Sequence, residues 1–74
     1  MDRTQNITGK YKHYKGQMYE VIGECTHTET GEVFVIYKAL YAPYRMWVRP
    51  WIMFFESVDT AFGQPSIPRF ERVE

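Results

Sequence analysis

Val33-Phe34-Val35-Ile36-Tyr37-Lys38-Ala39-Leu40-Tyr41 is the most apolar stretch of this chain. Successive side chains of a β-strand point to opposite faces of a sheet. Both faces of this stretch are largely apolar, because valine, tyrosine and alanine alternate with phenylalanine, isoleucine, lysine and leucine. A strand that is covered on both sides is typical of the centre of a strongly curved sheet. The stretch therefore predicts the central strand of a mostly β domain.

Two further strands are expected upstream of this segment. Residues 28–32, which contain Gly31, form a hairpin connection to a strand at Met18–Thr26. Gly23 in the middle of that strand indicates a β-bulge or a barrel corner where another backbone comes close. The turn at Lys15-Gly16 then leads back to a first strand at residues 9–14.

Downstream, the dipeptide Ala42-Pro43 ends the central strand. Pro50 lacks an N–H and has a fixed φ angle, which suits the start of a single helical turn at Trp51–Phe54. Three short strands are expected around this turn, at Met46–Arg49, Phe55–Asp59 and Arg69–Val73.

These elements together predict a mostly β fold: a small, SH3-like, partly open barrel of five to six short strands with one short helical turn. Closure or near-closure of a short sheet protects its edge strands. The alternative is an open antiparallel sheet that dimerises through its exposed face. We expect residues 1–8 to be a flexible N-terminal segment and residues 9–74 to be one small β-barrel domain.

A chain of 74 residues with a single cysteine, Cys25, must be stabilised by packing alone. Its six tyrosines, five phenylalanines and two tryptophans provide that packing, and eight of these rings fall between residues 34 and 55. The first residues contain no apolar run, and no later stretch has the ~18 consecutive apolar residues of a membrane span. We therefore expect a cytoplasmic protein that has no membrane partner.

The net charge is zero, but charges of one sign occur in blocks along the chain. Residues 1–16 carry a net positive charge. All charged side chains in residues 17–36 are acidic, and all those in residues 37–55 are basic. The remaining residues carry a net negative charge. Strand pairing could place blocks of opposite sign opposite each other on solvated faces. A basic patch for nucleic acid is the alternative interpretation.

Six short motifs are spread between residues 9 and 70, namely Gly9-x-Tyr11-x-His13-Tyr14-Lys15-Gly16, Tyr19-x-Val21, His27-x-Glu29-Thr30, Val35-x-Tyr37-x-x-Leu40-Tyr41, Trp47-Val48-Arg49-Pro50-x-x-Met53-Phe54 and Pro68-Arg69-Phe70. Their succession resembles a family of short bacterial proteins, the domain of unknown function family 1653. The resemblance implies a compact, mostly β, stand-alone domain. It implies no activity, ligand or catalytic residue.

Side chains with catalytic or metal-binding chemistry are few. Cys25 and His27 are two residues apart and could act together as a thiolate and a base, but no third group orients the imidazole. The same pair with His13 and Glu29 has neither the knuckle spacing nor the helical spacing of a metal site. We predict no catalytic residue, no metal and no cofactor.

A binding constellation is better supported, because tyrosine, tryptophan and arginine offer large rigid surfaces with polar handles. If the strands that carry them are neighbours, these rings form a stacking platform with a guanidinium at its edge. The predicted ligand-binding residues are His27, Glu29, Tyr37, Tyr41, Trp47 and Arg49. The alternative interpretation makes the tyrosine and tryptophan core residues and pairs the arginine with a glutamate.

Three classes of function follow from these observations. The first is a non-enzymatic binding module that uses the aromatic and arginine face to hold a protein segment or a small polar ligand. The second is a nucleic-acid-binding module that adds the residues Lys10, Tyr11, Lys12, Tyr14, Lys15 and Arg45. The third, least favoured, is a small enzyme that depends on His27. If the rings of Trp51, Phe55 or Phe62 form an exposed apolar patch, that patch predicts a homodimer.

Overall fold

The computed structural model describes residues 6–74 of the chain. These residues form strands and one short helix, which the chain visits in the order β1 (Gly9–His13), β2 (Met18–Thr26), β3 (Val33–Ala39), β4 (Met46–Pro50), α1 (Trp51–Phe54), β5 (Ser57–Val58), β6 (Ile67–Pro68) and β7 (Phe70–Arg72). The prediction of a mostly β chain with one helical turn is therefore confirmed.

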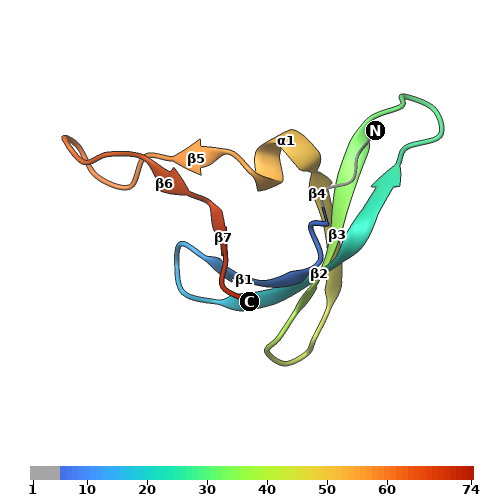
Figure 1. Cartoon of the computed structure of the whole chain (residues 1–74), viewed down its shortest axis with the longest axis horizontal. Helices are drawn as coiled ribbons and strands as arrows, with labels where there is room; N and C mark the ends of the chain where they lie inside the picture. Colours follow the sequence, from blue (N-terminus) through green and yellow to red (C-terminus); the bar gives the residue numbers. More distant parts are fainter. Residues whose placement is uncertain (1–5) are drawn as a thin grey trace.

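The strands form a five-stranded antiparallel sheet in the order β4-β3-β2-β1-β7 and a separate two-stranded sheet of β5 and β6. In Figure 1 the larger sheet bends sharply, and α1 lies across its open side while the β5–β6 ribbon extends away from it. Strands β4 and β7 are the two edges of this sheet and do not pair with each other. The sheet therefore does not close, and the predicted SH3-like barrel is not confirmed.

The expected bulge in β2 is present. Val21 pairs with Tyr37 but Gly23 pairs with Ile36, so Ile22 is an extra residue that has no partner on β3. The bulge reverses the alternation of faces beyond it, which places Cys25 in an exposed position although simple alternation predicts the core face. A Cβ atom added to Gly23 would meet no atom of residues 6–74 within 4 Å, so space does not require a glycine at this bulge.

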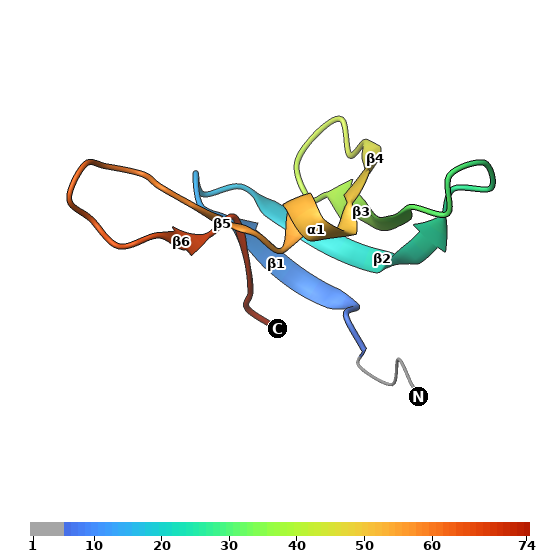
Figure 2. The same cartoon turned by 90° about the horizontal axis from the view of Figure 1, so that it is seen from above.

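The core lies between the sheet and α1. The sheet face that packs against Phe54 of α1 is called the inner face below, and the opposite face the outer face. Phe54 is fully buried, and its ring stacks on that of Phe70 with centroids 4.1 Å apart and an angle of 4° between the ring planes. Tyr11 and Tyr37 meet the Phe54 ring edge-on at 5.5 and 5.2 Å. Figure 2 shows α1 lying above the strands that carry these rings.

The segment after α1 differs from the expected strand at residues 55–59. The N–H of Phe55 still donates to the carbonyl oxygen of Trp51 at 3.2 Å, so the helical turn extends to that residue. The strand is shortened to Ser57–Val58, and it pairs with Ile67–Pro68, for which no strand was expected.

Strand β1 pairs with β7, and the backbone bonds between these two segments continue to Glu74. Lys10 N–H donates to the carbonyl oxygen of Glu74 at 3.3 Å, and Val73 N–H donates to that of Lys10 at 2.8 Å. Gly9 has a φ of +144°, and a Cβ atom at this position would lie 2.5 Å from the carbonyl oxygen of Glu74. A glycine is therefore required here by both backbone conformation and space.

Two sequence-based expectations concern the chain as a whole. The flexible segment predicted at residues 1–8 falls partly on residues 1–5, which lie outside the described residues, so the division at residue 8 stays a prediction. Across residues 6–74, no helix has the length and apolar character needed to cross a membrane.

Candidate functional site

Arg49 lies on the inner face of β4 and is the charged group around which the candidate site is built. It pairs in register with Val35, and its Nε atom donates a hydrogen bond to the hydroxyl oxygen of Tyr37 at 3.3 Å. Its guanidinium carbon lies 5.7 Å from the centre of the Phe70 ring. No carboxylate within residues 6–74 pairs with Arg49, so its two amino groups keep unused hydrogen-bond donors.

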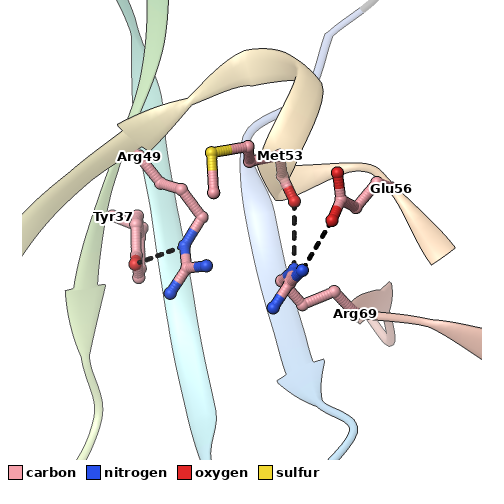
Figure 3. A network of polar contacts seen from close by, with 5 residues as sticks. All are labelled: Tyr37, Arg49, Met53, Glu56 and Arg69. Atoms are coloured by element: carbon pink, nitrogen blue, oxygen red, sulfur yellow. Dashed lines mark hydrogen bonds and ion pairs between the residues drawn. The ribbon is translucent and has the colours of Figure 1, made fainter. Parts of the chain in front are cut away.

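Arg69, immediately before β7, has a contrasting environment. Its Nε atom donates to the carbonyl oxygen of Met53 at 3.1 Å, and its Nη2 atom lies 2.7 Å from Oε2 of Glu56. Figure 3 shows these two bonds beside the guanidinium of Arg49, which has a single dashed line, to Tyr37. Arg69 therefore fastens the end of α1 to the sheet, whereas Arg49 has one hydrogen bond, to Tyr37, and no carboxylate partner among residues 6–74.

Two tyrosine hydroxyls lie at the end of the inner face where β2 begins. The Tyr19 and Tyr41 hydroxyl oxygens are 2.7 Å apart, and the ring centroids are 5.6 Å apart. Burial, followed by the hydrogen bond to Tyr41, raises the pKa of Tyr19 to about 12. Tyr41 is 41% exposed, so this tyrosine pair lies at the margin of the inner face and not in the core.

His13 at the end of β1 also faces the inner side. Its ring lies 4.9 Å from Phe70 and 6.4 Å from Tyr19. Its Nδ1 atom accepts the backbone N–H of Lys15 at 3.1 Å, which assigns the proton of the neutral ring to Nε2. Burial lowers the pKa of His13, and the positive charges of Arg49, Arg69 and Lys15 lower it further.

Trp47 completes the site on β4. It pairs directly with Tyr37, so the two side chains project from the same face of the sheet. Tyr37 is buried at 5% exposure, whereas Trp47 is 46% exposed and leaves part of its indole open. We call this set the aromatic–arginine face, and it consists of His13, Tyr19, Tyr37, Tyr41, Trp47 and Arg49.

The structure brings four of the predicted ligand-binding residues into this face: Tyr37, Tyr41, Trp47 and Arg49. It places the other two, His27 and Glu29, in the exposed β2–β3 hairpin, beyond the pair Thr26–Val33. The hairpin lies at the other end of β3 from Tyr41, about 25 Å away along an extended strand. Nδ1 of His27 accepts the backbone N–H of Glu29 at 3.0 Å and of Thr30 at 3.3 Å, which gives this imidazole a role in shaping the turn.

Sequence reasoning did not place His13 and Tyr19 among the ligand-binding residues. Both follow the alternation of their strands, since Tyr11 and Tyr19 are directly paired and His13 lies two residues after Tyr11. That alternation was the available signal. The sequence does not reveal the order of the strands in the sheet, in which β1 lies between β2 and β7.

The residues of the nucleic-acid alternative do not form one basic surface. Tyr11 is only 4% exposed, and its hydroxyl donates to the carbonyl oxygen of Ile7 at 2.9 Å. Lys10 pairs in register with Glu20, which pairs with Lys38 on the next strand. The remaining cations lie elsewhere: Lys12 is opposite Glu71, Lys15 lies 5.8 Å from the ring of the partly exposed Tyr14, and Arg45 precedes β4.

Residues with metal or thiol chemistry are scattered. No group of three histidine, cysteine, aspartate or glutamate side chains is arranged to hold a metal ion within residues 6–74. Cys25 is a free, exposed thiol that pairs in register with Phe34 on the outer side of β2.

A separate groove of about 380 Å³ lies between the helix and the β1–β7 edge. Trp51 and Phe55, two of the rings considered for a dimer contact, line it and pack with centroids 4.5 Å apart. The third, Phe62, lies apart in a fully exposed loop. The homodimer stays a prediction.

The fold and this face define a small antiparallel β domain that presents aromatic rings on the inner side of a bent sheet, together with an arginine that has no carboxylate partner among residues 6–74. The chain belongs to the family described as protein of unknown function (DUF1653), whose model matches residues 9–72. The resemblance seen in the sequence motifs is thereby confirmed.

A solved structure supports the same assignment. The chain is similar to a protein of this family from Bordetella bronchiseptica, known from a crystal structure, with a TM-score of 0.81 and 38% sequence identity. The similarity covers 97% of this chain and 92% of that protein. No curated protein matches the chain.

Proposed function

We propose that this protein is a non-enzymatic binding module that holds an anionic group of a protein segment or small polar ligand on its aromatic–arginine face. The observation that carries the proposal is the state of Arg49. Its Nε atom is anchored to Tyr37, while its amino groups have no acceptor within the described part of the chain. A planar guanidinium with free amino groups is suited to bind a carboxylate or a phosphate through paired hydrogen bonds.

The surroundings of Arg49 support such binding. Arg49 is half-buried beside the Phe70 ring, so an ion pair formed there is screened less than one on an open surface. Trp47 offers an open indole surface for stacking, and Tyr41 offers a hydroxyl. Together these groups would bind a ligand that combines an acid with an apolar or planar part.

The alternatives have less support. A nucleic-acid-binding surface requires a basic excess, whereas Lys10, Glu20 and Lys38 alternate in sign across three strands. An enzyme that uses His27 as a base requires a free nitrogen lone pair, and the Nδ1 lone pair of His27 already accepts the hairpin backbone N–H groups, which places the proton of the neutral ring on Nε2. The free thiol of Cys25 favours a reducing, cytoplasmic setting. The strand order, with α1 before the last sheet strand, supports an open relative of the SH3-like architecture.

The test is a titration with N-acetylglutamate, followed by tryptophan fluorescence and by calorimetry. We expect binding to the unmodified protein, and a loss of about tenfold or more in affinity for Arg49→Met, because a hydrogen-bonded ion pair contributes roughly 1.5 kcal/mol or more. Lys38→Met is the matched control, since it removes one cation from the outer face of the adjacent strand. Equal affinity in both variants would refute the proposal.

A further inference from the structure

We infer that the open edge of β4 accepts an extended acidic peptide segment as an added antiparallel strand. The inference rests on the proposed function, because it names the partner class for the face that contains Arg49. It draws on three observations: the direction of the β4 backbone groups, the charge along this strand, and the exposure of its apolar side chains.

The backbone of β4 presents a short window of unused hydrogen-bonding groups. Ala39 N–H donates to the carbonyl oxygen of Arg45 at 2.9 Å, which identifies this pair as a hydrogen-bonded pair of the β3–β4 ladder. Hydrogen-bonded and non-hydrogen-bonded pairs alternate in an antiparallel ladder. Met46 and Val48 therefore direct their N–H and C=O groups away from β3, where no other strand of the described chain pairs with them. Pro50 has no N–H, so the window ends before it.

The charge along this edge has one sign. Residues 37–55 contain Lys38, Arg45 and Arg49 and no aspartate or glutamate. Arg45 and Arg49 flank Trp47 at alternate positions, and neither guanidinium has a carboxylate partner among residues 6–74. An antiparallel strand added here would place its own alternate residues opposite these two cations, so acidic residues at those positions would be paired.

The outer face of the edge is apolar. Met46 is 59% exposed and Val48 is 58% exposed, and Ile22 of the bulge is 47% exposed on the same side of the sheet. Residues of an added strand that lie opposite Met46 and Val48 would bury part of this surface if they were apolar. The edge therefore fits a five-residue pattern of acid, apolar, any residue, apolar, acid.

A second copy of this chain is a poorer occupant of the same edge. The symmetric antiparallel register that uses both Met46 and Val48 of each copy is centred on Trp47. That register places Arg45 of one copy opposite Arg49 of the other, twice. Like charges that face each other across a strand pair are destabilising, so the edge disfavours self-pairing and favours an acidic segment.

The experiment uses the whole protein and the blocked peptide acetyl-Glu-Val-Thr-Val-Glu-amide, with amide hydrogen exchange followed by NMR. At a peptide concentration of about ten times Kd, we expect exchange at Met46 and Val48 to slow by about tenfold, because their N–H groups are then free for about a tenth of the time. A peptide N-methylated at both valines is the matched control, since it keeps the charges and loses the backbone donors that face β4. It should give no protection.

The charge requirement is tested with a peptide that carries lysine in place of both glutamates and with two protein variants. The lysine peptide should not bind, Arg45→Met should weaken the glutamate peptide about threefold, and Arg49→Met should weaken it about tenfold. Equal affinities of the protein for the lysine peptide and the glutamate peptide would refute the inference. So would protection of Met46 and Val48 that grows with protein concentration in the absence of peptide, which would indicate self-pairing.

The two proposals fail in different ways. If N-acetylglutamate and the peptide both depend on Arg49 but Met46 and Val48 gain no protection, strand addition is wrong and the anion site stands. If neither probe depends on Arg49, both proposals are wrong.

Discussion

Arg49 and Tyr37 lie diagonally across neighbouring strands, and the Nε atom of Arg49 donates to the Tyr37 hydroxyl at 3.3 Å. Because Tyr37 is buried and packs edge-on against both Phe54 and Phe70, its hydroxyl is a fixed acceptor. The bond therefore holds the stem of the arginine, while its amino groups have no acceptor among residues 6–74. Arg69, which directly precedes Phe70 in the chain, has its own Nε and Nη2 engaged by α1 and Glu56.

Tyr37→Phe tests the role of this bond. The ring and its packing stay, while the acceptor for Arg49 is lost, so we expect anion affinity to fall about threefold to fivefold and the free energy of unfolding to fall by about 1 kcal/mol. The measurements are an N-acetylglutamate titration and urea denaturation. Tyr44→Phe, which alters an exposed tyrosine, is the control and should change neither quantity. An unchanged affinity in Tyr37→Phe would show that Arg49 is positioned by other contacts.

Phe54→Ala tests the core. Phe54 is fully buried and stacked on Phe70, so its truncation should cost about 3–5 kcal/mol. A domain of this size has only a few kcal/mol of stability, so we expect the variant to be largely unfolded by circular dichroism. Phe62→Ala, at a fully exposed ring, should stay within about 0.5 kcal/mol of the unmodified protein. Similar effects at the two positions would contradict this core.

Gly9→Ala and Gly16→Ala separate backbone strain from steric conflict. Both glycines have positive φ angles, +144° and +109°, so both substitutions strain the backbone. Only Gly9 also lacks space, since its new Cβ would lie 2.5 Å from the carbonyl oxygen of Glu74. We expect Gly9→Ala to cost about 1–3 kcal/mol more than Gly16→Ala in urea denaturation. Equal losses would mean that Glu74 is not held against β1.

His13 should make stability depend on pH. Burial, and then the charges of Arg49, Arg69 and Lys15, lower its folded pKa below the unfolded value of 6.5, so the unfolded chain binds the proton more readily. Stability is complete above pH 6.5 and falls as the pH drops toward the folded pKa. Urea denaturation between roughly pH 7.5 and 5.5 should show this loss, and His13→Asn should reduce it. An NMR titration that gives His13 a pKa above 6.5 would contradict the environment described for it.

Much of the fold could be predicted from alternation and turn residues. The bounds of β2 at Met18–Thr26 and of α1 at Trp51–Phe54 agree with the predicted ranges, because the long β2 run lies between two glycine-containing turns and Pro50 precedes the helical turn. The pairing of Ser57–Val58 with Ile67–Pro68 could not be predicted, because two-residue strands have no periodicity.

The site was only partly predictable. Tyr37, Trp47 and Arg49 could be grouped because β3 and β4 are consecutive and their alternation is clear. His13 and Phe70 join them only through the pairing of β1 with β7, a contact between the two ends of the chain. His27 and Glu29 are included in the predicted site on the assumption that the hairpin lies close to the ring-bearing part of the sheet. In the structure the whole length of β3 separates these two residues from Tyr41.

The central claim is that Arg49, and not Arg69, has amino groups open to an anion. The most direct measurement is the nitrogen-15 NMR spectrum of the arginine side chains during addition of N-acetylglutamate. We predict that the Nε–H resonance of Arg49 shifts together with the Trp47 indole, while that of Arg69 stays in place because Glu56 and Met53 already bind it. A titration that moves Arg69 and leaves Arg49 unchanged would contradict the account.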